Sequence, residues 1–357
     1  MASIRKTSFG TFEVYGYRVV GGERKRFSKS FKTKADAKKY AAEVELAPTE
    51  RSSNIILSVL IDDYITVRTS QKRAKRQEEI RLKRLQRNKL AEMPLSSITK
   101  ETIQKYIAQR LKEKAYRKDE PVSPATVRRE MVTISDVFNY AVDLGMVEAN
   151  PCHGVQKPRN SEPRDRIASD EDIQKLLAAS GWDGKSMPRS ETELSIAAFL
   201  LSCRTGMRSG EMLRIERSWI DGNVIHLPQE ATKTLSRRDV ALSTSALEVL
   251  NLILEIGFKP RIFGDMSDRQ RDVLFRKVVE RADLGPVKDS EGRLIKEGLH
   301  FHDGRATFAT WAASPDPDTG APRLDVLALA KQTGHKNLKM LARYYRASAE
   351  EIAKRLK

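Results

Sequence analysis

Two stretches without hydrophobic periodicity divide the chain, and they constrain its fold more than any other feature. Residues 47–54 are polar and include a proline, and residues 155–166 are rich in proline and charge. Such stretches are typical of linkers between folded parts. A chain of 357 residues is long enough for two or three domains, each with a buried core. We therefore expect three domains, at residues 1–46, 55–150 and 165–357.

The first predicted domain combines a small sheet with one helix. Short apolar and polar runs from Phe12 to Val20 are followed by Gly21-Gly22, a pair typical of hairpin turns, and then by the basic run Arg24–Phe31. Apolar side chains recur at helical spacing after Thr33. These patterns predict a three-stranded sheet followed by a helix.

The other two predicted domains are mainly helical. Within 55–150, Ser123-Pro124 is typical of a helix start and Asp143-Leu144-Gly145 of a helix end. After residue 167 the helical pattern resumes with the capping signature Ser169-x-x-Asp172. Two short β runs, 223–227 and 239–242, interrupt it. The predicted fold class is therefore mainly α with small β elements, the last domain being mixed α/β and mostly helical.

The charge of the chain favours a polyanionic partner. The formal net charge is +17 and the pI is about 9.8. Excess Lys and Arg favours nucleic acid, because each neutralised phosphate releases counterions. A basic protein with no nucleic-acid partner is the alternative. The candidate DNA contacts are basic residues of the first two domains: Arg24, Lys25, Arg26, Lys29, Lys72, Arg73, Lys75, Arg76, Arg128 and Arg129.

The compartment follows from what the sequence lacks. No apolar run reaches membrane-spanning length, and the first residues lack the apolar stretch of a signal peptide. Two cysteines, Cys152 and Cys203, make neither a disulfide framework nor a metal site by themselves. We expect a cytoplasmic protein that does not associate with membranes.

Two cationic positions in the third domain suit phosphate chemistry. Arg208 lies in a glycine-punctuated turn before an amphipathic helix, where Glu211 can orient it by accepting a hydrogen bond. The alternative is a surface arginine with an acidic neighbour. Lys233 lies between the two short β runs, where a lysine can protonate a leaving group, and Arg237 and Arg238 compete for this role. A solvated loop lysine is the alternative there.

An imidazole and a guanidinium follow further along. His302 and Arg305 are three residues apart, so they share one face of a helix and suit one phosphate. The neighbouring His300 raises a metal pair as an alternative. No carboxylate or cysteine completes a recognised ligand spacing, so we expect neither a metal nor a cofactor.

A second histidine and a candidate nucleophile complete the series. His335 follows Thr-Gly, and Tyr344 comes nine residues later. Because nine residues make about two and a half turns, an unbroken helix would put the two side chains on opposite faces. The chain must therefore bend between them, near Asn337. Tyr345 competes for the role of nucleophile, and a packed aromatic is the alternative for either tyrosine.

The order and spacing of these residues resemble those of the tyrosine recombinase (phage integrase) family. The shared pattern is TGxRxxE, a hairpin lysine, HxxR, and GH followed after nine residues by Tyr. The resemblance covers nearly the whole chain: an arm-site-binding unit at 1–46, a helical core-binding (SAM-like) domain at 55–150 and a catalytic domain at 165–357. The chain departs from the family at Gly304 and Ala306, where Leu and His are common.

The resemblance implies a role for each position of the pattern. Glu211 would support the first arginine, and Tyr344 would attack the scissile phosphate. The remaining residues would bind or protonate that phosphate: Arg208 and Arg305 at the non-bridging oxygens, Lys233 as general acid toward the 5′-oxygen, His302 in proton transfer and His335 by hydrogen bonding.

The implied function is that of a site-specific DNA recombinase, or integrase. It would integrate or excise a phage or mobile element in a bacterial host through a 3′-phosphotyrosyl intermediate and a Holliday junction. Its implied partners are double-stranded attachment sites, further copies in a synaptic homotetramer, a directionality factor and a host DNA-bending protein. A type IB topoisomerase-like enzyme and a DNA-binding regulator on a recombinase scaffold are the alternatives. The tail 347–357 either packs on a neighbouring subunit or covers its own domain.

Overall fold

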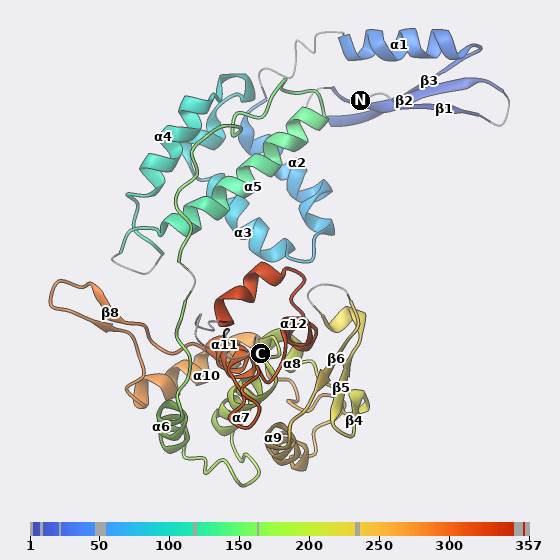
Figure 1. The fold of residues 1–357 in the computed structure, drawn as a ribbon. Coiled ribbons are helices and arrows are strands. Elements are labelled where there is room, and N and C mark those ends of the chain that lie inside the picture. The colour runs from blue at the N-terminus through green and yellow to red at the C-terminus, as the bar shows by residue number, and fades with distance from the viewer. Residues whose placement is uncertain are drawn as a thin grey trace. The chain divides into compact units, whose positions relative to one another are not determined.

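The computed structural model describes most of the chain, in two compact units, 1–163 and 164–357 (Figure 1). The described residues are 3–7, 10–20, 23–46, 55–116, 120–162, 164–232, 236–345 and 353, without the side chains of 17–26 and 42–46. Three predicted features lie outside them: the turn at Gly21-Gly22, Lys233, and all of the tail 347–357 except Ala353.

The first unit begins with the predicted sheet and helix. The antiparallel strands lie in the order β1-β2-β3, with Phe12 opposite Phe31. Val14 of the sheet and Ala37 of the helix are buried in one small cluster. The elements are β1 (Ser3–Lys6), β2 (Phe12–Val20), β3 (Glu23–Phe31) and α1 (Lys34–Leu46).

Four helices follow in the first unit, as the pattern predicts. They are α2 (Leu57–Val67), α3 (Lys75–Leu85), α4 (Lys100–Arg110) and α5 (Pro124–Asp143). The Ser123 hydroxyl accepts a hydrogen bond from the Thr126 amide and Pro124 opens α5, which confirms the predicted start. Fully buried side chains such as Ile61, Met131 and Phe138 form the core between these helices.

The second unit is built around α7 (Glu191–Thr205). Every residue from Leu194 to Cys203 is buried, so this helix has no solvent-facing side over that stretch. The surrounding helices are α6 (Asp170–Ser180), α8 (Ser209–Met212), α9 (Thr244–Glu255), α10 (Asp268–Arg281), α11 (Asp303–Ala313) and α12 (Val326–Thr333). The predicted capping box between Ser169 and Asp172 opens α6.

A small antiparallel sheet lies in the same unit, with strand order β4-β5-β6. Its strands are β4 (Ile220–Asp221), β5 (Val224–Leu227) and β6 (Arg238–Ala241), of which β5 and β6 correspond to the two predicted β runs. The sequence pattern missed β4 because two residues show no alternation of buried and exposed side chains.

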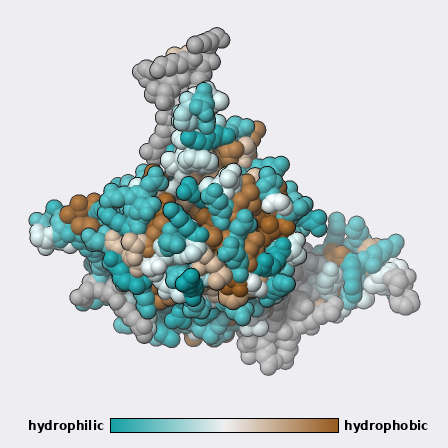
Figure 2. Space-filling model, turned by 90° about the horizontal axis from the view of Figure 1, so that it is seen from below, coloured by the Kyte–Doolittle hydropathy of each residue, from teal (hydrophilic) through white to brown (hydrophobic). Residues whose placement is uncertain are grey.

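The sequence pattern also missed the hairpin of β7 (Val287–Lys288) and β8 (Leu294–Lys296). It projects from the second unit, and its side chains at 287, 294 and 295 are exposed, which gives the hydrophobic tip at the left edge of Figure 2. Neither strand buries a face, so no apolar periodicity marks them.

Gly304, where leucine is common in the family that the chain resembles, lies close to α7. A Cβ atom at this position would lie 3.1 Å from Phe199 and 3.2 Å from Cys203 of α7. Helix α11 therefore approaches α7 more closely than a larger residue at 304 would allow. Across the part of the chain that the structure describes, no helix is both long and apolar enough to cross a membrane.

Candidate active site

Arg208 is held where α7 gives way to α8. It is the N-cap residue of α8, and its guanidinium donates from Nη1 to Oε1 of Glu211 at 3.0 Å and from Nη2 to the Gly334 carbonyl at 2.5 Å. The backbone amide of Arg208 also donates to Oε2 of Glu211, at 3.3 Å. The predicted hydrogen bond between these two side chains is therefore present, and it leaves the guanidinium 20% exposed.

Arg305 is held more deeply, in the first turn of α11. The residue is 5% exposed, and its Nη1 donates to the carbonyls of Gly206 and Thr333, both at 2.7 Å. These carbonyls belong to the C-terminal ends of α7 and α12, where the helix leaves acceptors unpaired and the dipole is negative. Helix ends thus supply the partners that allow a guanidinium to be buried here.

His335 lies directly against Arg305. Nη2 of Arg305 is 3.0 Å from Nε2 of the ring, and the Thr333 hydroxyl is 2.7 Å from Nδ1. That hydroxyl has one hydrogen, which it donates to the Leu329 carbonyl at 2.6 Å. It must then accept from Nδ1–H, so the network assigns a neutral ring with its proton on Nδ1 and with Nε2 accepting from Arg305.

The electrostatics of the site agree with a neutral ring. Burial is the largest cause that lowers the pKa of His335, and the charges of Arg305, Arg208, Arg238 and His302 act in the same direction, so that the pKa is about 4. The pKa of Arg305 is lowered to about 9, first by burial and then by the charges of Arg208 and Arg238. At neutral pH the site therefore holds a protonated Arg305 beside an uncharged imidazole.

Gly334 allows the two arginines to meet α12. It ends that helix with φ +71, in the left-handed region that favours glycine. A Cβ atom here would lie 3.0 Å from Nη1 of Arg208 and 2.5 Å from Nη1 of Arg238. The glycine of the GH pair is thus required both by the turn and by the guanidinium groups packed against it.

The segment between His335 and Tyr344 bends, as predicted. Helix α12 stops at Thr333, and two 3₁₀ turns follow, η6 (Leu338–Met340) and η7 (Ala342–Tyr344). Asn337 caps η6 by accepting a hydrogen bond from the Lys339 amide at 3.0 Å. In a continuous helix, His335 and Tyr344 would lie on opposite faces. Because 3₁₀ turns replace that helix, the two side chains can face the same site.

The two neighbouring tyrosines differ in how their hydroxyls are used. The hydroxyl of Tyr345 donates to the Leu324 carbonyl at 2.8 Å, and burial raises its pKa to about 12. The hydroxyl of Tyr344 makes no hydrogen bond to any residue that the structure describes. Tyr345 therefore has a structural role, whereas the Tyr344 hydroxyl is available for another partner.

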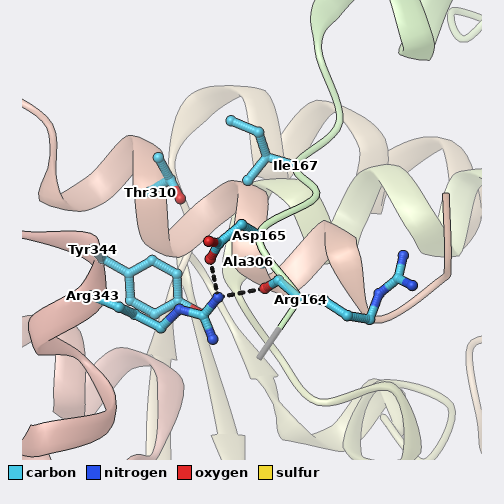
Figure 3. Close-up of a pocket in the computed structure, with 7 residues that line it drawn as sticks. All are labelled: Arg164, Asp165, Ile167, Ala306, Thr310, Arg343 and Tyr344. Carbon is cyan, nitrogen blue, oxygen red and sulfur yellow. Dashed lines mark hydrogen bonds and ion pairs between the residues drawn. The ribbon is translucent and has the colours of Figure 1, made fainter. Parts of the chain in front are cut away.

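Tyr344 lines a pocket of about 110 Å³ at the start of the second unit (Figure 3). Ala306 and Thr310 of α11 also line it. The neighbouring Arg343 donates to the Arg164 carbonyl and the Asp165 carboxylate, as the dashed lines in Figure 3 show. The tyrosine segment is thus attached to residues 164–165 through one arginine.

The structure brings four of the predicted site residues into one network: Arg208, Glu211, Arg305 and His335. His302 is exposed at the N-cap of α11, close enough to lower the pKa of His335. Tyr344 is half-buried and contributes to the electrostatics of Arg305. Lys233 lies outside the described residues, between Thr232 and Ser236.

The predicted DNA contacts fall into three groups. Lys29, Arg73, Lys75, Arg76 and Arg129 are exposed, whereas the side chains of Arg24, Lys25 and Arg26 lie outside the description. Two others have partners within the first unit. The Lys72 ammonium donates to Tyr64 and Glu78 at 2.7 and 2.8 Å, and Arg128 donates to the Pro158 carbonyl at 3.0 Å.

Sequence reasoning missed one residue of the site. Arg238, considered only as a competitor of Lys233, is the first residue of β6, and its side chain is 7% exposed. Its Nη1 donates to Oε2 of Glu211 at 2.9 Å. The sequence did contain a signal that Arg238 is buried. Side chains alternate between the two faces of a strand, so Arg238 lies on the same face as the apolar Val240.

Comparison with known proteins agrees with this site. The model of the phage integrase family matches residues 168–351, and that of the phage integrase SAM-like domain matches 57–157. A putative integrase/recombinase of Haemophilus influenzae is 34% identical over 329 residues, which cover 89% of this chain and 81% of that one. A shufflon-specific DNA recombinase of Escherichia coli is 28% identical over 312 residues, covering 87% and 73%.

Solved structures share the fold. A lambda integrase dimer bound to a COC′ core site has a TM-score of 0.64 at 17% identity, covering 96% of this chain and 94% of that one. The Tn1549 transposon integrase in complex with circular intermediate DNA has a TM-score of 0.62 at 15% identity, covering 85% and 100%. The chain therefore belongs to the phage integrase family and is a site-specific tyrosine recombinase.

Proposed function

We propose that this recombinase cuts and rejoins DNA with Tyr344 as its nucleophile and with Arg208 and Arg305 as the clamp for the scissile phosphate. One observation carries the assignment. Both guanidiniums are anchored at the C-terminal end of α12, Arg305 through the Thr333 carbonyl and Arg208 through the Gly334 carbonyl. Neighbouring carbonyls thus hold two planar cations side by side, and guanidinium groups suit the oxygens of a phosphate.

The reaction then needs no high-energy cofactor. The Tyr344 hydroxyl gives up its proton to His302, and its oxygen bonds to phosphorus as the bond from phosphorus to the 5′-oxygen breaks, which leaves a 3′-phosphotyrosyl link and a free 5′-hydroxyl. Lys233 supplies the proton that the leaving oxygen takes up. A 5′-hydroxyl of the partner duplex attacks the link in the reverse sense and releases the tyrosine. Negative charge that develops on the phosphate is offset by cations already in place.

The histidines act through protons and hydrogen bonds. In the absence of DNA, Nε2 of His335 accepts from Arg305, so the neutral ring has no donor there. A phosphate between the arginines adds negative charge, which raises the pKa of His335 and favours a proton on Nε2 that a phosphate oxygen can accept. His302, exposed at the start of α11, is placed for proton transfer at the same phosphate.

The partners follow from the same proposal. Double-stranded attachment sites are the substrate, and two of them require a synaptic homotetramer that passes through a Holliday junction. The related lambda integrase has been solved as a tetramer bound to a Holliday junction. Residues 1–46 bind arm-type sites, and a directionality factor and a host DNA-bending protein set the outcome. The enzyme acts on a phage or mobile element in the bacterial cytoplasm.

The experiment that tests the nucleophile uses a nicked duplex cut from the junction of the element. Loss of the short product traps a covalent adduct, which a denaturing gel detects without metal or ATP. We expect wild type and Tyr345→Phe to form the adduct and Tyr344→Phe to form none. Tyr345→Phe is the matched control, because it removes the neighbouring hydroxyl that is used on the Leu324 carbonyl.

Other outcomes assign the chain differently. An adduct that persists in Tyr344→Phe and disappears in Tyr345→Phe moves the nucleophile by one residue. Specific binding without any adduct in wild type favours a DNA-binding regulator. Relaxation of supercoiled DNA without strand exchange between two duplexes favours a topoisomerase-like enzyme.

A further inference from the structure

One carboxylate in the site is shared by two arginines. Oε1 of Glu211 accepts from Nη1 of Arg208 at 3.0 Å, and Oε2 accepts from Nη1 of Arg238 at 2.9 Å. The side chains of Glu211 and Arg238 are 3% and 7% exposed, so this contact is buried. Glu211 is therefore not the exclusive partner of Arg208, although the sequence pattern suggests a simple pair of neighbours three residues apart.

The sharing changes the charge that Arg208 presents. A buried pair of Arg208 and Glu211 alone would be electrically neutral. With Arg238 on the other oxygen, the three side chains keep one net positive charge, close enough to Arg305 for Arg208 and Arg238 to lower its pKa. Charges interact more strongly in a buried site than in water, so a phosphate would sense the difference between a neutral pair and a cationic group of three.

We propose that Arg238 is a positioning residue that fixes Glu211 and keeps Arg208 effectively cationic toward the scissile phosphate. The inference rests on the proposed role of Arg208 as a phosphate clamp. Arg238 acts through Glu211 and need not touch the DNA. Its contact with α12 supports this: its Nη1 lies against Gly334, whose carbonyl holds Arg208.

The hydrogen bonds of Arg238 argue against a purely stabilising role. Its Nε and Nη2 atoms are buried and have no hydrogen-bond partner among the described residues. Buried donors without partners reduce stability, and native proteins keep few of them. A strand residue selected only for stability would be apolar here, like Val240 two positions along. The guanidinium is retained at a cost, which a functional role explains.

The ionisation of Glu211 points the same way. Burial acts to raise the pKa of this carboxyl, but the charges of Arg238 and Arg208, in decreasing order of effect, bring it below its ordinary value. Both arginines thus keep Glu211 ionised, Arg238 through its charge and its hydrogen bond just as Arg208 does. An ionised Glu211 is what orients the Arg208 guanidinium through Oε1.

The test compares Arg238→Gln, Arg238→Lys and the matched control Arg237→Gln, which changes the exposed neighbour. For each protein we would measure the single-turnover rate of adduct formation on the nicked duplex, the affinity for that duplex and the thermal midpoint of unfolding. We expect Arg238→Gln to form the adduct roughly tenfold to hundredfold more slowly at unchanged affinity and an unchanged or higher midpoint. Arg238→Lys keeps the charge and should recover most of the rate, while Arg237→Gln behaves as wild type.

Several results would overturn the inference. A rate for Arg238→Gln within threefold of wild type shows that the charge is not needed. Equal losses in Arg238→Lys and Arg238→Gln, or a lowered midpoint that accounts for the lost rate, show a structural role instead. If wild type itself forms no adduct, the proposed chemistry is wrong. If wild type forms the adduct and Arg238→Gln forms it equally fast, only the role of Arg238 is wrong.

Discussion

The two halves of the active site are held in place by different means. Arg305 is 5% exposed and donates to carbonyls at the ends of two helices, and Arg208 donates to a buried carboxylate and a third carbonyl. Tyr344, in contrast, is half-buried in a 3₁₀ turn, and its hydroxyl has no hydrogen-bond partner in the described part of the chain. The side chain of Arg343 ties that turn to residues 164–165.

This difference suggests that the arginine half and the tyrosine half have different roles in the reaction. In the proposed phosphate-binding half, hydrogen bonds within the protein already hold the charges in place, so these need not reorganise during the reaction. In the tyrosine half, η7 contains no fully buried residue, so this turn should open at lower cost than the arginine half. Control of strand cleavage is therefore expected to act on the tyrosine segment and not on the arginines.

The largest expected effect comes from removing the shared carboxylate. Glu211→Gln leaves two buried guanidiniums without a negative partner, so we expect the second unit to lose about 3–5 kcal/mol of stability. Adduct formation should slow by about a hundredfold as Arg208 loses its orientation. Urea unfolding followed by tryptophan fluorescence measures the first effect, because Trp182, Trp219 and Trp311 all lie in this unit.

The control is the same substitution at an exposed ion pair. Glu171→Gln removes the partner of Lys175 on the surface of α6, where the glutamate side chain is 76% exposed. Because both side chains of this pair lie in water, the change should leave the free energy of unfolding nearly unchanged. Equal losses at positions 171 and 211 would mean that the arginine half is not preorganised by Glu211.

An intermediate effect is expected in the protonation of His335. Its pKa of about 4 lies below the ordinary value, so the stability contributed by the neutral ring is complete above about pH 6.5 and is lost as the pH falls toward 4. Orthovanadate bound between the arginines would add negative charge and raise this pKa. Titration of the ring by NMR measures the pKa of His335 without and with vanadate, and His335→Gln assigns the signal. An unchanged pKa in vanadate would argue against a phosphate site beside His335.

The smallest expected effect is at Arg343. Its pairing with Asp165 lies at the surface, with side chains 30% and 69% exposed, so the contact is worth less than about 1 kcal/mol. Arg343→Ala should speed hydrogen exchange of the Tyr344 amide, which donates to Leu341, by about twofold to fivefold. The Gly334 amide, which donates to Ala330, should exchange as before.

Lys339→Ala provides the control for that measurement. It removes a cation from the same segment at an exposed position outside the contact with residue 165. Exchange at Tyr344 that rises equally in both variants would show that loss of charge, and not release of the Arg343 contact, loosens the turn. Exchange that rises at Gly334 as well would mean that the two halves are coupled.

The local signals of the sequence were reliable where one physical cause acted alone. The capping box at Ser169 and the proline start of α5 were predicted because a cap depends on residues within one turn. The bend before Tyr344 was predicted near Asn337, which caps η6 after α12 has ended at Thr333. The hairpin β7–β8 was missed because its strands bury no face.

The sequence by itself determined the fold class and the family, because helix periodicity, caps and the spacing of Arg208, His302, Arg305, His335 and Tyr344 are properties of the linear chain. Only the tertiary structure decided how these groups are partnered. The guanidinium of Arg305 is held by carbonyls from residues 206 and 333, and Glu211 by an arginine 27 positions away. Contacts across such separations depend on how helix ends and a strand meet, which no local pattern of side chains encodes.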